Sequence, residues 1–196
     1  MSSKIKNKYI AFVYTKLTVF MLFWYVLSLI ITYFKGKREL PAYSSIKDLY
    51  MVVSRNNSMY KDTKYLLLSH PRHIQYNIEK NNFIGDCDNH SLYWCSSIID
   101  SRLAKKAWLC IYHMERDGKL MGHSVCAYQD FSDRYFYFDY KYPKEIKNIE
   151  DWMCNSGKTF GAEPICGLMF QIGLFNNSKF PKLKGILKVL PKRNEE

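Results

Sequence analysis

The chain has 196 residues, of which 47% are hydrophobic and 16% aromatic. This composition excludes a generally disordered chain, and the length is short for two full domains. The formal net charge of +11 favours anionic partners. The basic C-terminal tail, however, lacks the interleaved aromatic residues of single-strand binders, which argues against nucleic acid as a partner. The six cysteines include no C-x-x-C pair, and we expect neither a metal nor another cofactor.

Residues 17–34 form an apolar run without a charged residue, proline or glycine. As a helix this run would be about 27 Å long, close to the roughly 30 Å hydrocarbon core of a bilayer. It predicts an uncleaved, single-pass membrane anchor in contact with lipid, whose orientation the flanking positive charges do not decide. A very apolar soluble helix, packed on the domain or on a partner, is the alternative. The predicted division is a basic segment with anchor at 1–38, a folded domain at 39–176 and a basic tail at 177–196.

The pattern after this run predicts one principal helix. A short helix is expected at 45–53, followed by polar segments that include a loop at 70–82. The principal helix begins near Cys87, with Asp86 or Asp88 as its cap. Its apolar positions recur three and four residues apart, at Leu92, Cys95, Ile98 and Ile99.

Beyond this helix the hydrophobic period becomes that of β-strands. Three successive strands of an antiparallel meander are expected at 107–114, 122–129 and 134–140. Asp117-Gly118 predicts a hairpin turn between the first two strands, and residues 130–133 read as the second turn. The tail beyond residue 176 is expected to be irregular or to form a short amphipathic helix.

Cys87 stands where a helix is predicted to begin. The partial positive charge of a helix N-terminus stabilises a thiolate, and pairing with an imidazolium lowers the thiol pKa further. The thiolate is the nucleophilic form of cysteine. Cys87 is therefore a candidate nucleophile that needs a base.

His123 is the candidate base, and Asp139 is the residue expected to orient it. The midpoint between positions 123 and 139 is residue 131, which lies inside the predicted turn. Positions equidistant from an antiparallel turn lie opposite each other, with Cβ atoms about 5 Å apart. The pattern therefore predicts Asp139 beside His123, as the third member of a catalytic triad.

Three sequence segments resemble the transglutaminase-like cysteine peptidases of the papain-like superfamily. Gly85-Asp86-Cys87-Asp88-Asn89-His90 is similar to the segment that opens their catalytic helix. Gly122-His123-Ser124-Val125 is similar to their base strand, and Tyr137-Phe138-Asp139 to their aromatic strand that ends in the triad aspartate. The resemblance covers residues 70–145. It implies an α+β fold with a papain/transglutaminase-like core, in which the catalytic helix packs on an antiparallel sheet, here with an N-terminal transmembrane helix.

The resemblance also implies acyl transfer through a thioester at Cys87. The oxyanion hole would use the Cys87 backbone N–H and a second donor upstream, for which Gln75 and Asn82 are candidates that match no family motif. Asn89 stands where many relatives have an acidic residue. A metal site at Asp86, Cys87, Asp88 and His90 is disfavoured, because neighbours on one short turn rarely converge on one ion. Asp88 is interpreted instead as a cap or a surface charge.

Three functions remain open from the sequence. The first is a membrane-anchored cysteine hydrolase, a peptidase or amidase that acts on a peptide or protein substrate, or a transamidase that shares its acyl-enzyme step. The second is a catalytically inactive papain-like scaffold that serves as a membrane-bound binding or assembly module. The third is a binder of anionic polymers driven by the net charge, whose mark would be steep salt dependence.

Overall fold

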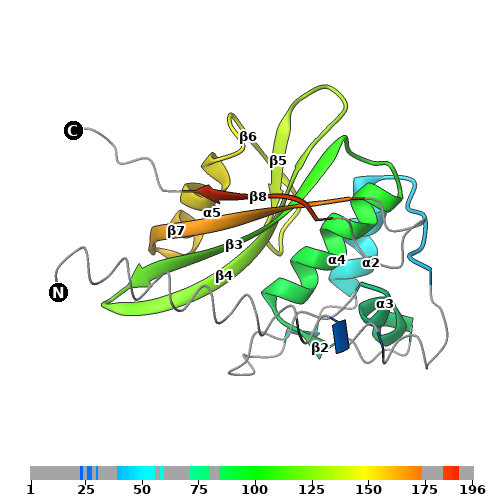
Figure 1. Ribbon diagram of the computed structural model, residues 1–196, viewed down its shortest axis with the longest axis horizontal. Coiled ribbons are helices and arrows are strands. Elements are labelled where there is room, and N and C mark those ends of the chain that lie inside the picture. Colours follow the sequence, from blue (N-terminus) through cyan, green and yellow to red (C-terminus); the bar gives the residue numbers. More distant parts are fainter. Residues whose placement is uncertain are drawn as a thin grey trace.

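The computed structural model describes residues 39–55, 58–59, 71–79, 84–173 and 183–189, together with four helical residues, Phe23, Val26, Leu27 and Ile30. The helices are α2 (Ile46–Arg55), α3 (Pro71–Glu79), α4 (Cys87–Asp100) and α5 (Asp151–Phe160). The strands are β1 (Ser58–Met59), β2 (Ile84–Gly85), β3 (Lys106–Arg116), β4 (Lys119–Gln129), β5 (Tyr135–Phe138), β6 (Lys144–Ile146), β7 (Glu163–Ile172) and β8 (Leu183–Val189). Figure 1 shows their arrangement.

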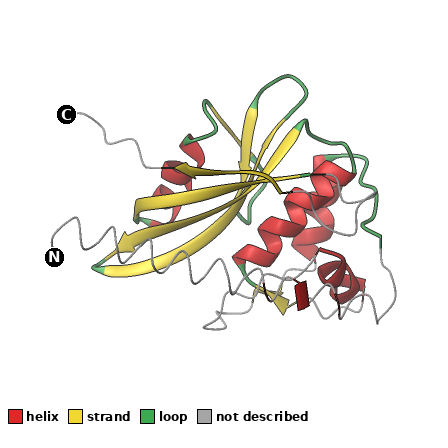
Figure 2. Cartoon of the chain, in the orientation of Figure 1, coloured by secondary structure: helices red, strands yellow, loops and turns green. Residues whose placement is uncertain are grey.

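A six-stranded antiparallel sheet is the centre of the fold, with the strand order β6-β5-β4-β3-β7-β8. Strands β1 and β2 form a separate, short parallel pair. The helices pack against a sheet whose strand pairs are antiparallel, so the described structure is α+β (Figure 2).

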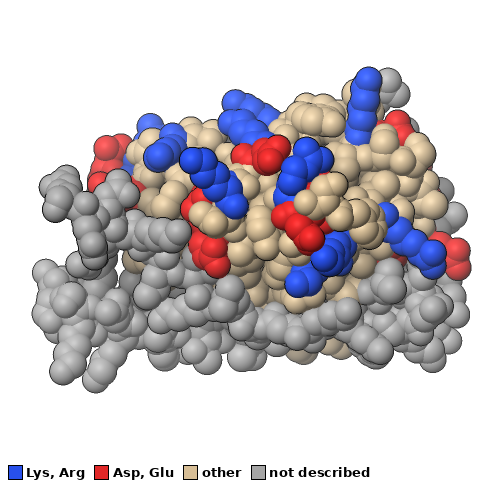
Figure 3. All heavy atoms as spheres, turned by 90° about the horizontal axis from the view of Figure 1, so that it is seen from above, with Lys and Arg blue, Asp and Glu red and all other residues tan. Residues whose placement is uncertain are grey.

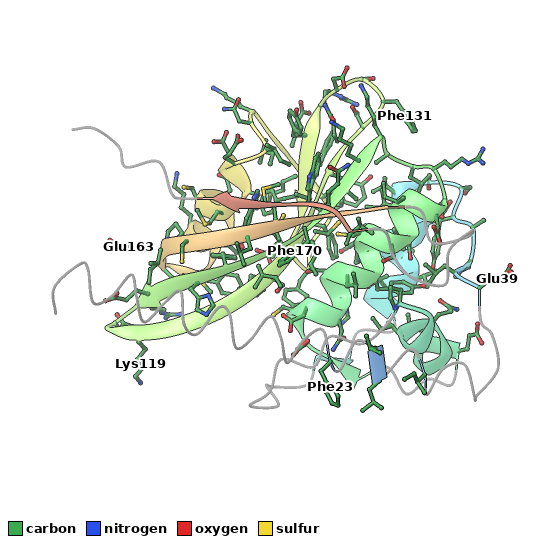
Figure 4. All side chains as sticks on the ribbon, viewed as in Figure 1. Phe23, Glu39, Lys119, Phe131, Glu163 and Phe170 are labelled. Atoms are coloured by element: carbon green, nitrogen blue, oxygen red, sulfur yellow. The ribbon has the colours of Figure 1, made fainter. Side chains whose placement is uncertain are left out.

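The β3–β4 hairpin closes through Asp117 and Gly118, both with positive φ (51° and 73°). A two-residue turn with positive φ at both positions matches the right-handed twist of the strands that it joins. The hairpin predicted from Asp-Gly is therefore confirmed, and its register pairs Arg116 with Lys119 and Tyr112 with His123. Figure 4 shows Lys119 at the tip of this hairpin and Phe131 at the opposite end, in the β4–β5 turn.

Two hydrophobic cores lie on opposite faces of the sheet, because alternate residues of each strand point to opposite sides. One core joins α2, α3 and α4 to one face, where Trp94 stacks on Phe138 with ring centroids 3.7 Å apart. The other core joins α5 to the opposite face through the buried side chains of Trp152 and Met153, which pack near Tyr112. The meander and the helix that precedes it are thus confirmed, and α5 covers the face that α4 leaves open.

The expected fold class requires a correction at its N-terminal part. Within the described ranges, no helix combines the length and the apolar character needed to cross a bilayer. Apart from the four helical residues given above, the run at 17–34 lies outside the described residues. The structure is therefore an α+β fold with an antiparallel sheet, and a transmembrane helix is not part of it as described.

Two further expectations about the elements were wrong. The segment at 70–82 was expected to be a loop, but it contains α3. The tail beyond 176 was expected to be irregular or helical, but it contributes β8, which pairs with β7 at the edge of the sheet. Strand β8 is basic in sequence, and lysine is a common residue of edge strands. The pattern also missed the run from β6 through α5 to β7.

Candidate active site

Cys87 is the first residue of α4, where the sequence places it. The cap is Asp86, which has an extended backbone and whose side chain accepts hydrogen bonds from both the backbone and the side-chain nitrogen of Asn89. Backbone N–H groups in the first turn of a helix have no partner within the helix. The Cys87 N–H is consequently of the kind that can stabilise an oxyanion.

His123 and Asp139 are in direct contact on the α5 side of the sheet. His123 Nε2 lies 2.8 Å from Asp139 Oδ1, and the two side chains are only 7% and 8% exposed. His123 belongs to β4 and shares its face with Val125 and Ala127, which are part of the α5 core. Asp139 directly follows the last residue of β5.

The predicted register between these two residues was wrong by two positions. Strands β4 and β5 pair Cys126 with Phe138 and Gln129 with Tyr135, so their turn centres on residue 132 and not on 131. Continued to the end of β5, this register places Asp139 opposite Val125. A shift of two residues keeps each side chain on its own face, and diagonal neighbours remain within reach of long side chains. His123 and Asp139 therefore meet diagonally.

The early end of β5 opens the edge of β4 to the helix that carries Cys87. Strand β5 pairs with β4 only from Cys126 onward, which leaves Ser124 outside that ladder. A backbone hydrogen bond from Ser124 reaches the Cys87 sulfur, and Ser124 Oγ donates to Asp88 Oδ1 over 2.8 Å. The nucleophile is thus bound to the residue that directly follows the base in the sequence.

Asp88 is fully buried and connects α4, which carries Cys87, to β4, which carries His123. Its Oδ1 accepts from Ser124 Oγ and, at 3.4 Å, from the Cys87 thiol. The interpretation of Asp88 as a cap or surface charge was wrong, because the first turn of α4 packs directly against β4. No local sequence signal distinguishes a buried aspartate of this kind from an exposed one.

The pKa of the Cys87 thiol is raised well above its usual range. Burial is the main cause, followed by the negative charges of Asp88 and Asp86, while the Ser124 backbone hydrogen bond opposes the shift. The lowered pKa expected from the helix N-terminus is therefore wrong: burial and two carboxylates outweigh the helix dipole. This shift favours the thiol over the thiolate at neutral pH.

The contact with Asp139 fixes the tautomer of His123. A carboxylate only accepts hydrogen bonds, so the ring proton is on Nε2 and the neutral imidazole keeps Nδ1 as its acceptor. Aromatic rings hold the imidazole in place, with centroids at 4.6 Å for Phe160, 5.7 Å for Tyr140 and 5.8 Å for Tyr112. These contacts fix the orientation of the imidazole and leave Nδ1 able to accept a proton.

The second oxygen of Asp139 has its own partner. Ser156 Oγ, on α5, donates to Asp139 Oδ2, and Tyr112 Oη donates to Ser156 Oγ over 2.7 Å. Neither residue was predicted from the sequence. The position of Tyr112 was predictable, because a two-residue turn at Asp117-Gly118 places this residue opposite His123. The position of Ser156 was not, since nothing in the local pattern relates α5 to the meander.

The two candidate oxyanion donors are not brought to Cys87 by the described contacts. Gln75 lies in α3, where its side-chain oxygen accepts from Tyr93 Oη and its nitrogen donates to Glu79 over 3.0 Å. The bond to Tyr93 ties α3 to α4, and the bond to Glu79 lies within α3, so both ends of the Gln75 amide are engaged away from Cys87. Asn82 lies outside the described residues.

The described residues contain no metal-ligand cluster, and the face shown in Figure 3 is not uniformly basic. Among the residues that the structure describes, no group of three histidine, cysteine, aspartate or glutamate side chains is arranged to hold a metal ion. On the face shown in Figure 3, basic and acidic side chains of the described residues are interspersed. This face therefore lacks the continuous basic patch that would attract an anionic polymer.

A comparison with known protein families found no family model that matches the chain, and a comparison with curated proteins found no significant match.

Proposed function

We propose that this protein is a cysteine hydrolase that cleaves an amide bond through Cys87, His123 and Asp139. The observation that carries the proposal is the 2.8 Å contact between His123 and Asp139, beside the Ser124 backbone that binds the Cys87 sulfur. The sequence resemblance to transglutaminase-like peptidases supports the same assignment from the motifs alone. The substrate class that this chemistry suits is the amide of a peptide or protein.

The reaction begins with proton transfer from the Cys87 thiol to His123 Nδ1. The sulfur attacks the carbonyl carbon, and the Cys87 backbone N–H stabilises the negative charge that develops on the carbonyl oxygen. The imidazolium then gives its proton to the departing amine, which leaves a thioester on Cys87. Water, deprotonated by His123, hydrolyses the thioester; an amine in place of water would give transamidation through the same intermediate.

Asp139 acts throughout by holding His123 in its productive tautomer and by stabilising the imidazolium. Because the pKa of Cys87 is raised, transfer of its proton to His123 belongs to the reaction itself and not to the resting state.

The second candidate function is an inactive scaffold that binds a partner. The raised pKa of Cys87 favours this alternative, since a protein without nucleophilic chemistry has no need to ionise this partly buried thiol. The two candidates differ in whether Cys87 reactivity depends on His123.

The test is alkylation of the full chain with iodoacetamide across pH, with each cysteine followed by mass spectrometry. Cys154, which is partly exposed, serves as the internal reference thiol. We expect His123→Ala to lower the rate of Cys87 alkylation at pH 7 by at least about tenfold, while the rate of Cys154 stays unchanged. Asp139→Asn, which keeps the side-chain shape, should lower the rate in the same direction.

A Cys87 alkylation rate that is indifferent to His123→Ala would exclude the hydrolase and leave the scaffold. If the expected pattern is found, trapping of an acyl-Cys87 adduct from a peptide amide or ester substrate, detected as a mass increase on that residue, would establish acyl transfer.

A further inference from the structure

The backbone of Asp139 is not held by the sheet in the way that His123 is. Asp139 follows the end of β5, and the next residue, Tyr140, has a left-handed backbone with φ of 55°. A carboxylate outside the strand ladder needs side-chain partners to fix the direction of its oxygens. The described contacts supply one partner for each oxygen, His123 for Oδ1 and Ser156 for Oδ2.

The hydroxyl of Ser156 links Asp139 to a second hydroxyl behind it. A serine hydroxyl has a single hydrogen, and the carboxylate can only accept it. The Tyr112 hydroxyl must then donate to Ser156, so the hydrogen bonds run in one direction, from Tyr112 to Ser156 to Asp139. Ser156 is fully buried, so water does not compete for these bonds.

The same tyrosine also contacts the base. Tyr112 pairs with His123 across the β3–β4 hairpin, and its ring meets the imidazole edge-on at 5.8 Å. One side chain therefore touches His123 directly and reaches Asp139 through Ser156. Such an arrangement fixes the imidazole and the carboxylate relative to each other.

We propose that Ser156 and Tyr112 are positioning residues for the His123–Asp139 pair, forming a buried relay that aims Asp139 at His123. The inference rests on the proposed function, because the consequence of the relay is read through Cys87. Ser156 touches neither substrate nor nucleophile; it acts by keeping one carboxylate oxygen bound so that the other stays on His123 Nε2. Hydrogen bonds to charged groups are the stronger ones, and buried networks are stiff when every member is satisfied.

The test compares Ser156→Ala, Tyr112→Phe and the double variant in the full chain. We expect Ser156→Ala to lower the rate of Cys87 alkylation at pH 7 by about tenfold and Tyr112→Phe by about threefold. The double variant should be no slower than Ser156→Ala alone, because Tyr112 reaches Asp139 only through Ser156. Ser96→Ala is the matched control: Ser96 is equally buried in a helix, but its hydroxyl bonds the Leu92 carbonyl.

A second readout does not depend on activity. The Nε2 proton of His123, held by Asp139, should give a low-field proton resonance that weakens or moves in Ser156→Ala and stays in place in Ser96→Ala. A purely structural role for Ser156 would leave this resonance unchanged in a variant that remains folded.

Retention of both the alkylation rate and the resonance in Ser156→Ala would overturn the relay. The hydrolase proposal would stand, provided that His123→Ala still lowers the rate of Cys87 alkylation by at least about tenfold. Additive losses of alkylation rate in the double variant would also overturn the relay, since they would mean that Ser156 and Tyr112 act on Cys87 independently. Indifference of Cys87 to His123→Ala would instead overturn the proposed function, and with it the catalytic role of the relay.

Discussion

At the scale of single residues, opposing effects meet at Cys87. The start of α4 and the Ser124 backbone hydrogen bond favour a thiolate, whereas burial and the carboxylates of Asp88 and Asp86 favour the thiol. The balance lies with the thiol. Uncoupled from His123, Cys87 should therefore gain reactivity only as the pH rises toward its raised pKa.

Asp86→Asn separates the charge of this residue from its capping role. Asparagine caps a helix as well as aspartate does, so α4 should keep its first turn. Removal of one negative charge lowers the pKa of Cys87, and we expect alkylation at pH 6 to become roughly threefold faster. The measurement is the pH dependence of Cys87 labelling.

Asp48→Asn is the charge-matched control, because Asp48 lies exposed on α2. An equal acceleration in both variants would mean that only the net charge of the protein matters, and no acceleration in either would mean that Asp86 does not act on the thiol.

The predictability of the site also differs from residue to residue. Cys87, His123 and Asp139 could be proposed from spacing, because a helix start and two turns are local signals. The two-residue register error did not separate His123 from Asp139, since an even shift preserves the face of a strand. Asp88 and Ser156 could not be placed, because their burial depends on which element packs over them.

At the scale of elements, the position of α5 decides whether Ser156 reaches Asp139. Gly167 of β7 makes this position possible: a Cβ there would lie 3.1 Å from both Trp152 and Met153, and 3.2 Å from Tyr112. The sequence of α5 contains a glycine and a threonine, which are weak helix formers. Packing rather than propensity holds this helix, which is why local patterns missed it.

Gly167→Ala should therefore both destabilise the protein and disturb the site. We expect a loss of about 1–3 kcal/mol in the free energy of unfolding from overpacking, together with slower alkylation of Cys87 as α5 moves outward. The free energy comes from urea denaturation and the rate from labelling in native buffer.

Gly118→Ala provides the comparison. Its added Cβ meets no atom within 4 Å, but φ of 73° strains an alanine by about 1–2 kcal/mol. Gly118→Ala should lower the free energy of unfolding without lowering the rate of Cys87 alkylation. If both variants lowered the rate of Cys87 alkylation in proportion to their loss of unfolding free energy, the link from α5 to the site would be refuted.

Strand β8 shows the same limit of local reasoning at the edge of the sheet. Strand β8 lies in the basic tail of the sequence. It pairs with β7 over Gly167–Ile172. Pairing between distant segments is a tertiary effect that no window of neighbouring residues contains. The hairpin and the principal helix, by contrast, were predictable because their signals are local.

At the scale of the whole molecule, one sheet serves two cores. The α4 core and the α5 core use alternate residues of the same strands, so neither face can be uncovered without exposing apolar residues of the shared sheet. We expect both to unfold in a single transition.

Two buried thiols report on the two cores separately. Cys95 belongs to the α4 core and Cys110 to the α5 core, and both are fully buried. In increasing urea, both should become reactive to a maleimide at the same midpoint, which mass spectrometry can read for each residue. Exposure of Cys110 at a clearly lower urea concentration than Cys95 would mean that α5 detaches by itself.

The order of the relay along the chain has a consequence for biosynthesis. Cys87, His123 and Asp139 all precede Ser156 in the sequence. The ribosome therefore synthesises these three residues before it synthesises the serine whose hydroxyl binds Asp139. A nascent chain that ends before α5 contains α4 and strands β3 to β5, but it lacks the helix that packs on the other face of the sheet. If Ser156 positions Asp139 as proposed, Cys87 should reach its full reactivity only after translation has passed α5.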